Sequence, residues 1–219
     1  MFSRIVLASL YAGILAGLLL TIIQQIQVVP LILEAETYEN AALVSGSEAE
    51  EWAPDDGWQR VLYTTVANMG TSIGFALLLT AAFSLRQIIS WKIGFLWGLA
   101  CYCIFFVLPT LGLPPELPGT EAAALKSRQI WWLLTVTCSG VGLAFVALQK
   151  RVLLRISGVA LLLLPHVIGA PSAPYEAGLL PEGLNEQFYW ATLLVNAIFW
   201  LVLGSLSAGF FSRLSRLAT

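Results

Sequence analysis

Residues 148–167, with the sequence LQKRVLLRISGVALLLLPHV, decide how many times this chain crosses a membrane. Their apolar part, residues 152–167, is shorter than the roughly 20 residues that a spanning helix needs, and Arg155 and Pro165 interrupt it. If this segment crosses, the chain has six spans and both termini lie on the same side. If it does not cross, the chain has five spans and the termini lie on opposite sides.

Five other apolar stretches are long enough to span a membrane. They cover approximately residues 5–33, 61–83, 93–111, 130–148 and 188–211. The 219-residue chain is 58% hydrophobic and 11% charged, whereas soluble domains carry about 25% charged residues. So few charges could not cover a water-facing surface. We therefore interpret residues 1–219 as a single integral membrane domain, an all-α bundle of transmembrane helices.

The charged residues divide between the two sets of connections that alternate along these stretches. All 13 acidic residues fall in three polar loops, at residues 34–56, 116–121 and 176–186. Most of the 11 basic residues fall at the chain ends or in the other connections, namely Arg4, Arg86, Lys92, Lys150, Arg151, Arg155, Arg213 and Arg216. Only Arg60, Lys126 and Arg128 depart from this division.

This division predicts the topology, because Lys and Arg are enriched in cytoplasmic connections. With five spans, residues 150–155 and 213–216 would face opposite sides, whereas six spans place every basic connection on one side. Arg155 lies one turn inside its helix, so its guanidinium can extend to the interface. We therefore predict six spans, five long and one short and broken near Pro165, with both termini cytoplasmic. In a bacterium the acidic loops would face the periplasm.

Polar residues interrupt the end of the first apolar stretch. Gln24 and Gln25 lie within it, and Glu34 and Glu36 follow Pro30. At helical spacing Gln24 and Glu34 share one face, and Gln25 and Glu36 share a neighbouring one. Amide and carboxylate oxygens suit a hydrated divalent cation, so these residues are candidates for an ion path. The alternative is that the glutamines form hydrogen bonds between helices and the acids form a solvated rim.

His166 is the only histidine of the chain. Pro165 before it removes a helix hydrogen bond, and Gly169 and Pro171 after it disfavour a regular helix. Irregular backbone at membrane depth is tolerated where it is buried in protein or lines a cavity. A neutral imidazole is a good ligand for Co, Ni and Zn, so His166 is a second candidate for a metal path. The alternative is a structural hydrogen bond.

Small residues recur four positions apart within the apolar stretches. The pairs are Gly13 and Gly17, Gly70 and Gly74, Gly94 and Gly98, and Gly204 and Ala208. Such spacing lets two helices approach closely. We expect the pairs to serve packing within the chain, although the same motif also suits a homo-oligomer.

The sequence contains none of the loops that bind nucleotides and none of the common catalytic motifs. We therefore predict that the chain is not an enzyme, needs no cofactor and is no self-contained ATP-driven pump. No basic patch exists to neutralise phosphates, so a nucleic-acid partner is excluded and the lipid bilayer is the expected surrounding.

Segments spread over most of the chain resemble the CbtA family, proposed cobalt transporter subunits of bacterial inner membranes. They are Leu15-Ala-Gly-Leu18, Gln24-Gln25, Pro30-Leu-Ile-Leu-Glu-Ala-Glu-Thr-Tyr-Glu39, Arg128-Gln129 and Leu164-Pro-His-Val-Ile-Gly-Ala-Pro171. The resemblance implies cobalt uptake, with Co²⁺ as the transported ion. It also implies a small single-span partner, CbtB, with a histidine-rich end. Such a partner would explain why this chain has one histidine and no compact metal motif.

Two functions remain open on the sequence. In the first, a metal permease subunit collects cations at its acidic periplasmic rim and passes them from Glu34 and Glu36 to His166, Gln24 and Gln25. In the second, the chain is a non-transporting scaffold or accessory subunit of a larger complex. Polar residues that converge on one cavity would favour transport, whereas local pairing in a dry interior would favour the scaffold.

Overall fold

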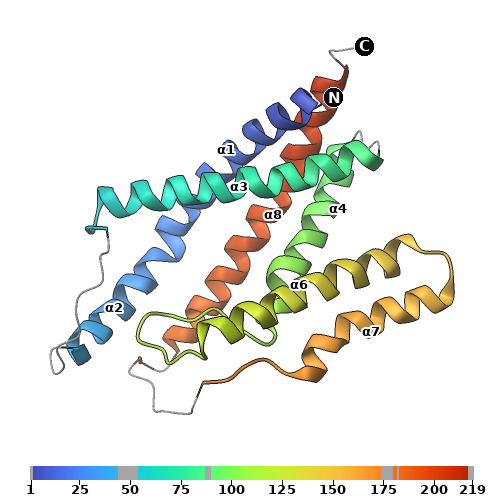
Figure 1. The fold of residues 1–219 in the computed structure, drawn as a ribbon. Coiled ribbons are helices and arrows are strands. Elements are labelled where there is room, and N and C mark those ends of the chain that lie inside the picture. Colours follow the sequence, from blue (N-terminus) through green and yellow to red (C-terminus); the bar gives the residue numbers. More distant parts are fainter. Residues whose placement is uncertain (1, 44–53, 87–89, 174–179, 182, 217–219) are drawn as a thin grey trace. The chain divides into compact units, whose positions relative to one another are not determined.

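The computed structural model describes residues 2–43, 54–86, 90–173, 180–181 and 183–216, and every regular element within them is helical. In chain order these elements are α1 (Phe2–Gln27), α2 (Val29–Leu43), α3 (Trp58–Arg86), α4 (Trp91–Tyr102), the π-helical turn η1 (Cys103–Val107), α5 (Leu108–Thr110), α6 (Leu125–Leu148), α7 (Val152–Ile168) and α8 (Leu184–Arg216) (Figure 1). The prediction of an all-α fold is confirmed.

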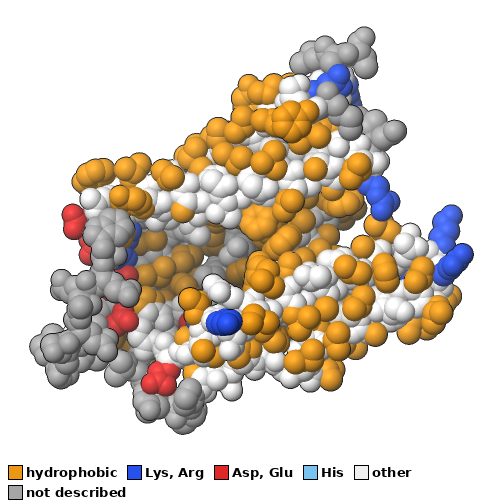
Figure 2. Space-filling model, in the orientation of Figure 1, with side chains coloured by type: hydrophobic (Ala, Val, Ile, Leu, Met, Phe, Trp, Pro, Cys, Tyr) orange, Lys and Arg blue, Asp and Glu red, His pale blue; other side chains and the backbone are white. Residues whose placement is uncertain are grey.

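Five of the described helical segments are long and apolar enough to cross a membrane, namely α1, α3, Trp91–Thr110, α6 and α8. The sixth predicted span corresponds to α7, which has 17 residues. Large apolar side chains such as Val66, Leu78 and Ile130 are exposed, whereas many buried positions hold Ala, Gly, Ser or Thr. Figure 2 shows hydrophobic side chains over much of the visible surface of the helices. This distribution is typical of a multi-pass membrane protein, because lipid covers apolar surface and small residues let helices pack.

The chain divides into two compact units. The first consists of Met1–Pro30, Gly46–Leu99 and Leu194–Thr219, and the second of Leu31–Ser45 and Ala100–Leu193. Both units are therefore assembled from segments that are far apart in the sequence.

In the first unit, α1 and α3 pack antiparallel through small residues. A Cβ at Gly13 would lie 2.6 Å from the Cα of Ile73, and one at Gly17 would lie 2.7 Å from the Cα of Met69. Both distances are shorter than real Cβ contacts, so the two backbones meet directly. Near the start of α1 the hydroxyls of Ser9 and Thr80 share a buried hydrogen bond of 2.6 Å. The Gly13 and Gly17 pair therefore serves packing within the chain, as predicted.

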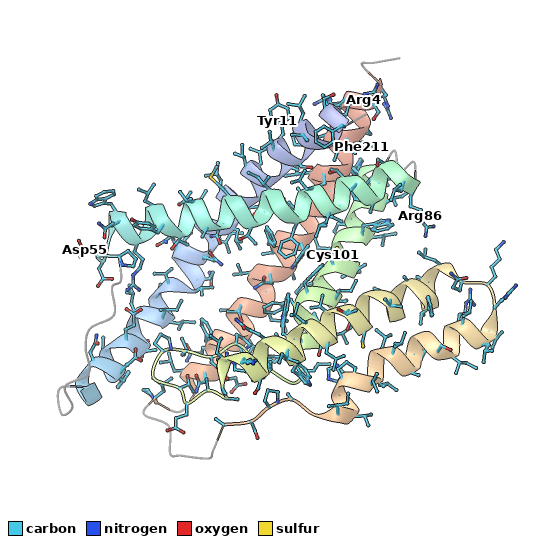
Figure 3. The ribbon with its side chains drawn as sticks, viewed as in Figure 1. Arg4, Tyr11, Asp55, Arg86, Cys101 and Phe211 are labelled. Atoms are coloured by element: carbon cyan, nitrogen blue, oxygen red, sulfur yellow. The ribbon has the colours of Figure 1, made fainter. Side chains whose placement is uncertain are left out.

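The first unit also contains the antiparallel contact of α4 with α8. A Cβ at Gly94 would meet Gly204 and Ala208, and one at Gly98 would meet Trp200. Tyr11, near the start of α1, contacts Phe210, near the end of α8, with ring centroids 5.7 Å apart. These registers place the start of α1 and the end of α8 at the same end of the unit. Figure 3 shows Arg4 and Arg86 toward that end and Asp55 at the other.

In the second unit, α6 and α7 form a helical hairpin. A Cβ at Gly142 would lie 2.7 Å from the carbonyl oxygen of Gly158, and the reverse distance is also 2.7 Å. Arg155 Nε donates to the carbonyl of Gln149 at 2.7 Å, across the short turn between the helices. The basic residues of this turn are therefore at one end of the unit, as their spacing in the sequence predicts.

The end of α7 differs from the predicted break near Pro165. The helix continues through Pro165, which is buried, and ends at Ile168 before Gly169 with φ of +88°. A proline in the last turns costs one backbone hydrogen bond but need not end the helix there. The positive φ of Gly169 favours glycine and ends the helix.

The helical backbone is irregular at two further places, each a few residues before a proline. The first apolar stretch, predicted as residues 5–33, is divided by a turn at Val28 between α1 and α2, two residues before Pro30. The turn η1 widens the helix just before Pro109 in α5. A proline lacks the N–H for the regular helical bond, and its ring clashes with the carbonyl four residues earlier, so both helices deviate on its N-terminal side.

Candidate functional site

Three polar side chains of α1 and α3 form a cluster in the first unit, which we call the amide cluster (Thr21, Gln24 and Asn68). Asn68 Nδ2 donates to Gln24 Oε1 at 2.7 Å and to Thr21 Oγ1 at 3.0 Å. Thr21 Oγ1 in turn donates to the carbonyl of Gly17 at 3.0 Å. The close approach at Gly17 brings the two helices near enough for these bonds. The predicted path residue Gln24 is therefore hydrogen-bonded between two helices.

Gln25 follows Gln24 in α1 and differs from it in its surroundings. Its Nε2 is buried and has no hydrogen-bond partner among the described residues. Successive helical residues point about 100° apart, so Gln25 cannot share the bonds of Gln24. A buried amide nitrogen without a partner is unusual in a folded protein and is a candidate contact for a ligand or its water.

The predicted acidic residues lie on α2, in the second unit. Glu34 is exposed, Glu36 is half-buried, and Ala35 between them is fully buried. Thr37 Oγ1 donates to the carbonyl of Glu34 at 2.7 Å. One turn later, a Cβ at Gly119 would lie 3.4 Å from the Cβ of Glu39, so α2 packs against the loop before α6. The carboxylate of Glu34 is therefore accessible to a cation.

His166 lies in the last turn of α7, beside the start of α6. Its ring meets Trp131 edge-on, with centroids 5.9 Å apart and planes at 72°. Trp131 is itself held by a hydrogen bond of 3.2 Å from its Nε1 to the carbonyl of Pro165. Gly112 permits this position, because a Cβ there would lie 2.7 Å from Cζ2 of the Trp131 ring. His166 Nε2 is buried and has no hydrogen-bond partner among the described residues.

The second unit thus presents, at the end of a helix, an imidazole nitrogen with no hydrogen bond to any described residue. A neutral imidazole can bind a transition metal through such a nitrogen. Within the described part of the chain, however, no three His, Cys, Asp or Glu side chains lie close enough to hold a metal ion.

The sequence matches a family described as "Probable cobalt transporter subunit (CbtA)" over residues 2–212. The chain belongs to the CbtA family. Curated proteins and solved structures gave no match. The expected resemblance is therefore confirmed, and the family description is that of a probable transporter subunit, a class that is generally not enzymatic.

Two structural features of this CbtA-family chain explain basic residues that departed from the charge pattern. Arg128 NH2 binds Glu116 Oε2 at 2.7 Å, and Arg60 NH2 binds Asp56 Oδ1 at 3.1 Å. Two of the three basic residues in the acidic connections, Arg60 and Arg128, are thus neutralised by a neighbouring carboxylate.

The sequence did not identify Thr21 and Trp131 as parts of the two sites. Thr21 lies three residues before Gln24 and on the same helix face, which is a signal that helical spacing could have supplied. Trp131 lies near the start of the fourth apolar stretch, where tryptophan is common at the membrane interface. Its contact with His166 depends on the hairpin register, for which the sequence carries no local signal.

Proposed function

We propose that this chain is the membrane subunit of a divalent transition-metal uptake transporter of the bacterial inner membrane, with Co²⁺ as its cargo. The match to the CbtA family over residues 2–212 carries this proposal. The buried polar nitrogens of Gln25 and His166 support it, because polar groups inside a membrane are costly and concentrate on substrate paths. The chain has no catalytic role and no resident cofactor in this proposal.

The proposed topology is one integral membrane domain with six spans and both termini in the cytoplasm. The contact of Tyr11 with Phe210 supports an even number of crossings, because the first helix begins where the last one ends. The hairpin supports α7 as the sixth span. α7 rises about 25 Å against a hydrocarbon core about 30 Å thick. α7 also lies alongside α6 from the basic turn, where α6 ends, to Trp131, which is near the start of α6.

In the proposed path, hydrated cations gather at the acidic periplasmic rim, where carboxylates raise their local concentration. Glu34 and Glu36 receive the ion, and His166, Gln24 and Gln25 provide later contacts. A membrane potential that is negative inside favours entry by about 2.3 kcal/mol per charge per 100 mV, or about 4.6 kcal/mol for a divalent ion. A small CbtB-type subunit with a histidine-rich end would supply the strong ligands that this chain lacks.

The test is uptake of radioactive cobalt into cells that express the chain with and without the histidine-rich subunit. Glu34→Gln and His166→Ala are expected to abolish saturable uptake while the protein reaches its normal level in the membrane. Glu186→Gln is the matched control, because Glu186 is an exposed carboxylate in the first turn of α8 and is not one of the proposed path residues. Normal cobalt accumulation in both path variants would refute the path.

A scaffold remains the second candidate, because Gln24 is bonded locally to Asn68 and the described residues form no three-ligand site. This function predicts no cobalt uptake under either condition, although the chain is well expressed. It also predicts that Glu34→Gln leaves assembly with the partner unchanged.

A further inference from the structure

A cavity of about 660 Å³ lies between α4 and α8 at the basic end of the first unit. Its described lining includes Ser90, Trp91, Ser205, Gly209, Arg213 and Arg216. This cavity is distant in sequence from every proposed path residue, and no step of cobalt transport uses it. Its volume falls within the range of about 300–1,000 Å³ that is usual for small-molecule sites.

The helix register explains why a cavity forms here. Gly94 and Gly204 hold the two backbones together, and Trp91 begins α4 three residues before Gly94. On α8, Ser205, Gly209 and Ser212 recur along one stripe and leave space beside this contact. No described atom lies within 4 Å of a Cβ placed at Gly209, so the space is open.

The lining combines positive charge, hydroxyl groups and apolar surface. Arg213 and Arg216 are three residues apart on α8, so their side chains lie on neighbouring parts of one face. Ser212 and Ser90 add hydroxyl groups, and the described lining contains no acidic side chain. Leu206 and Phe210 lie further into α8, away from its charged end. The charged groups therefore lie at the helix end and the apolar groups deeper along the helix.

We propose that this cavity binds the headgroup of an anionic phospholipid of the surrounding bilayer. Arginine and serine side chains recognise phosphate through charge-assisted and neutral hydrogen bonds. In this proposal the apolar residues deeper in α8 contact the start of an acyl chain, and Trp91, the first residue of α4, takes the interfacial position that tryptophan favours in membranes. Basic pockets between transmembrane helices bind anionic headgroups in this way. The proposal does not depend on metal transport.

The test uses the purified full-length chain in mild detergent with equal amounts of phosphatidylglycerol and phosphatidylcholine. Native mass spectrometry counts the lipids that remain bound. The unsubstituted chain is expected to retain phosphatidylglycerol preferentially, and Arg213→Gln with Arg216→Gln to weaken that binding by about tenfold or more. Lys150→Gln with Arg151→Gln is the matched control, because it removes the same charge outside the cavity and should leave binding unchanged.

A second variant, Gly209→Leu, fills the cavity without a change in charge. Leucine is a better helix former than glycine and the position is open, so this chain should fold and still lose the lipid. Retention of phosphatidylglycerol by both cavity variants at the level of the unsubstituted chain would overturn the proposal. Displacement of the lipid by inorganic phosphate alone would also overturn it, because the cavity would then be a site for a soluble anion.

Discussion

Gln25 offers the sharpest test of whether a polar residue of α1 serves structure or transport. Its Nε2 is buried without a partner among the described residues, whereas Gln24 next to it accepts a bond of 2.7 Å from Asn68. A buried polar group without a partner costs about 1–3 kcal/mol. The side chain of methionine is similar in length to that of glutamine and has no strong hydrogen-bond donor. Gln25→Met should therefore raise the free energy of unfolding by about 1 kcal/mol.

Gln24→Met is the matched control, because it makes the same chemical change one position earlier. It removes the bond from Asn68, and hydrogen bonds between membrane helices contribute about 0.6 kcal/mol on average. Gln24→Met should therefore lower the free energy of unfolding by about that amount. The two adjacent substitutions are expected to shift stability in opposite directions.

Unfolding of the purified chain in mixed micelles, followed as a function of the fraction of denaturing detergent, measures both free energies. Cobalt uptake is measured in cells that express the same variants. If Gln25 lies on the path, Gln25→Met is more stable and transports less, a combination that damage to the fold cannot produce. A loss of about 1 kcal/mol in Gln25→Met would refute the reasoning, because it would mean that the amide has a partner. Greater stability with normal uptake would remove Gln25 from the path.

Three further predictions concern packing and polar contacts. A double-mutant cycle of Gln24→Ala and Asn68→Ala should give a coupling free energy of about 0.6 kcal/mol in the same unfolding assay, and strict additivity would contradict the bond. Gly17→Val should lower the free energy of unfolding by about 1–3 kcal/mol, because its Cβ would lie 2.7 Å from Met69 Cα. Gly74→Ala, where no described atom lies within 4 Å, is its control and should not destabilise the chain. Arg128→Glu should cost about 1 kcal/mol, and Glu116→Arg in the same chain should restore it, since the two side chains are 2.7 Å apart. An unchanged loss in the double variant would exclude the ion pair as its cause.

The helices of this protein could be predicted because lipid leaves the backbone few alternatives. A chain inside the hydrocarbon must satisfy its N–H and C=O groups internally, so apolar length alone indicates helices such as α3 and α6. The partner of each polar side chain could not be predicted in this way. Gln24 and Gln25 were assigned to one path because both are glutamines in the same apolar stretch. Only Gln24 has a hydrogen bond to Asn68, because the rotation of α1 about its axis decides which of the two glutamines faces α3.

The prolines show a second limit of the sequence. Pro165 was expected to break the sixth span, but the helix continues through it and ends at Ile168, before Gly169. No irregularity was predicted at Pro109, yet it lies two residues after the π-helical turn η1. A proline indicates that a hydrogen bond is lost nearby, but neighbouring helices decide whether the backbone breaks, bends or widens.

The first unit is built from three separate segments of the chain, so it cannot be complete until the last of them has been synthesised. α8 follows all the other described helices in the chain, and its Gly204 and Ala208 cover Gly94 and Gly98 of α4. The α6–α7 hairpin can close as soon as it leaves the ribosome, whereas α4 must wait in the membrane until α8 has been made. A premature stop before α8 would leave the α1–α3 pair able to form, with the glycine face of α4 uncovered. Such a fragment would be a substrate for the proteases that remove incomplete membrane proteins.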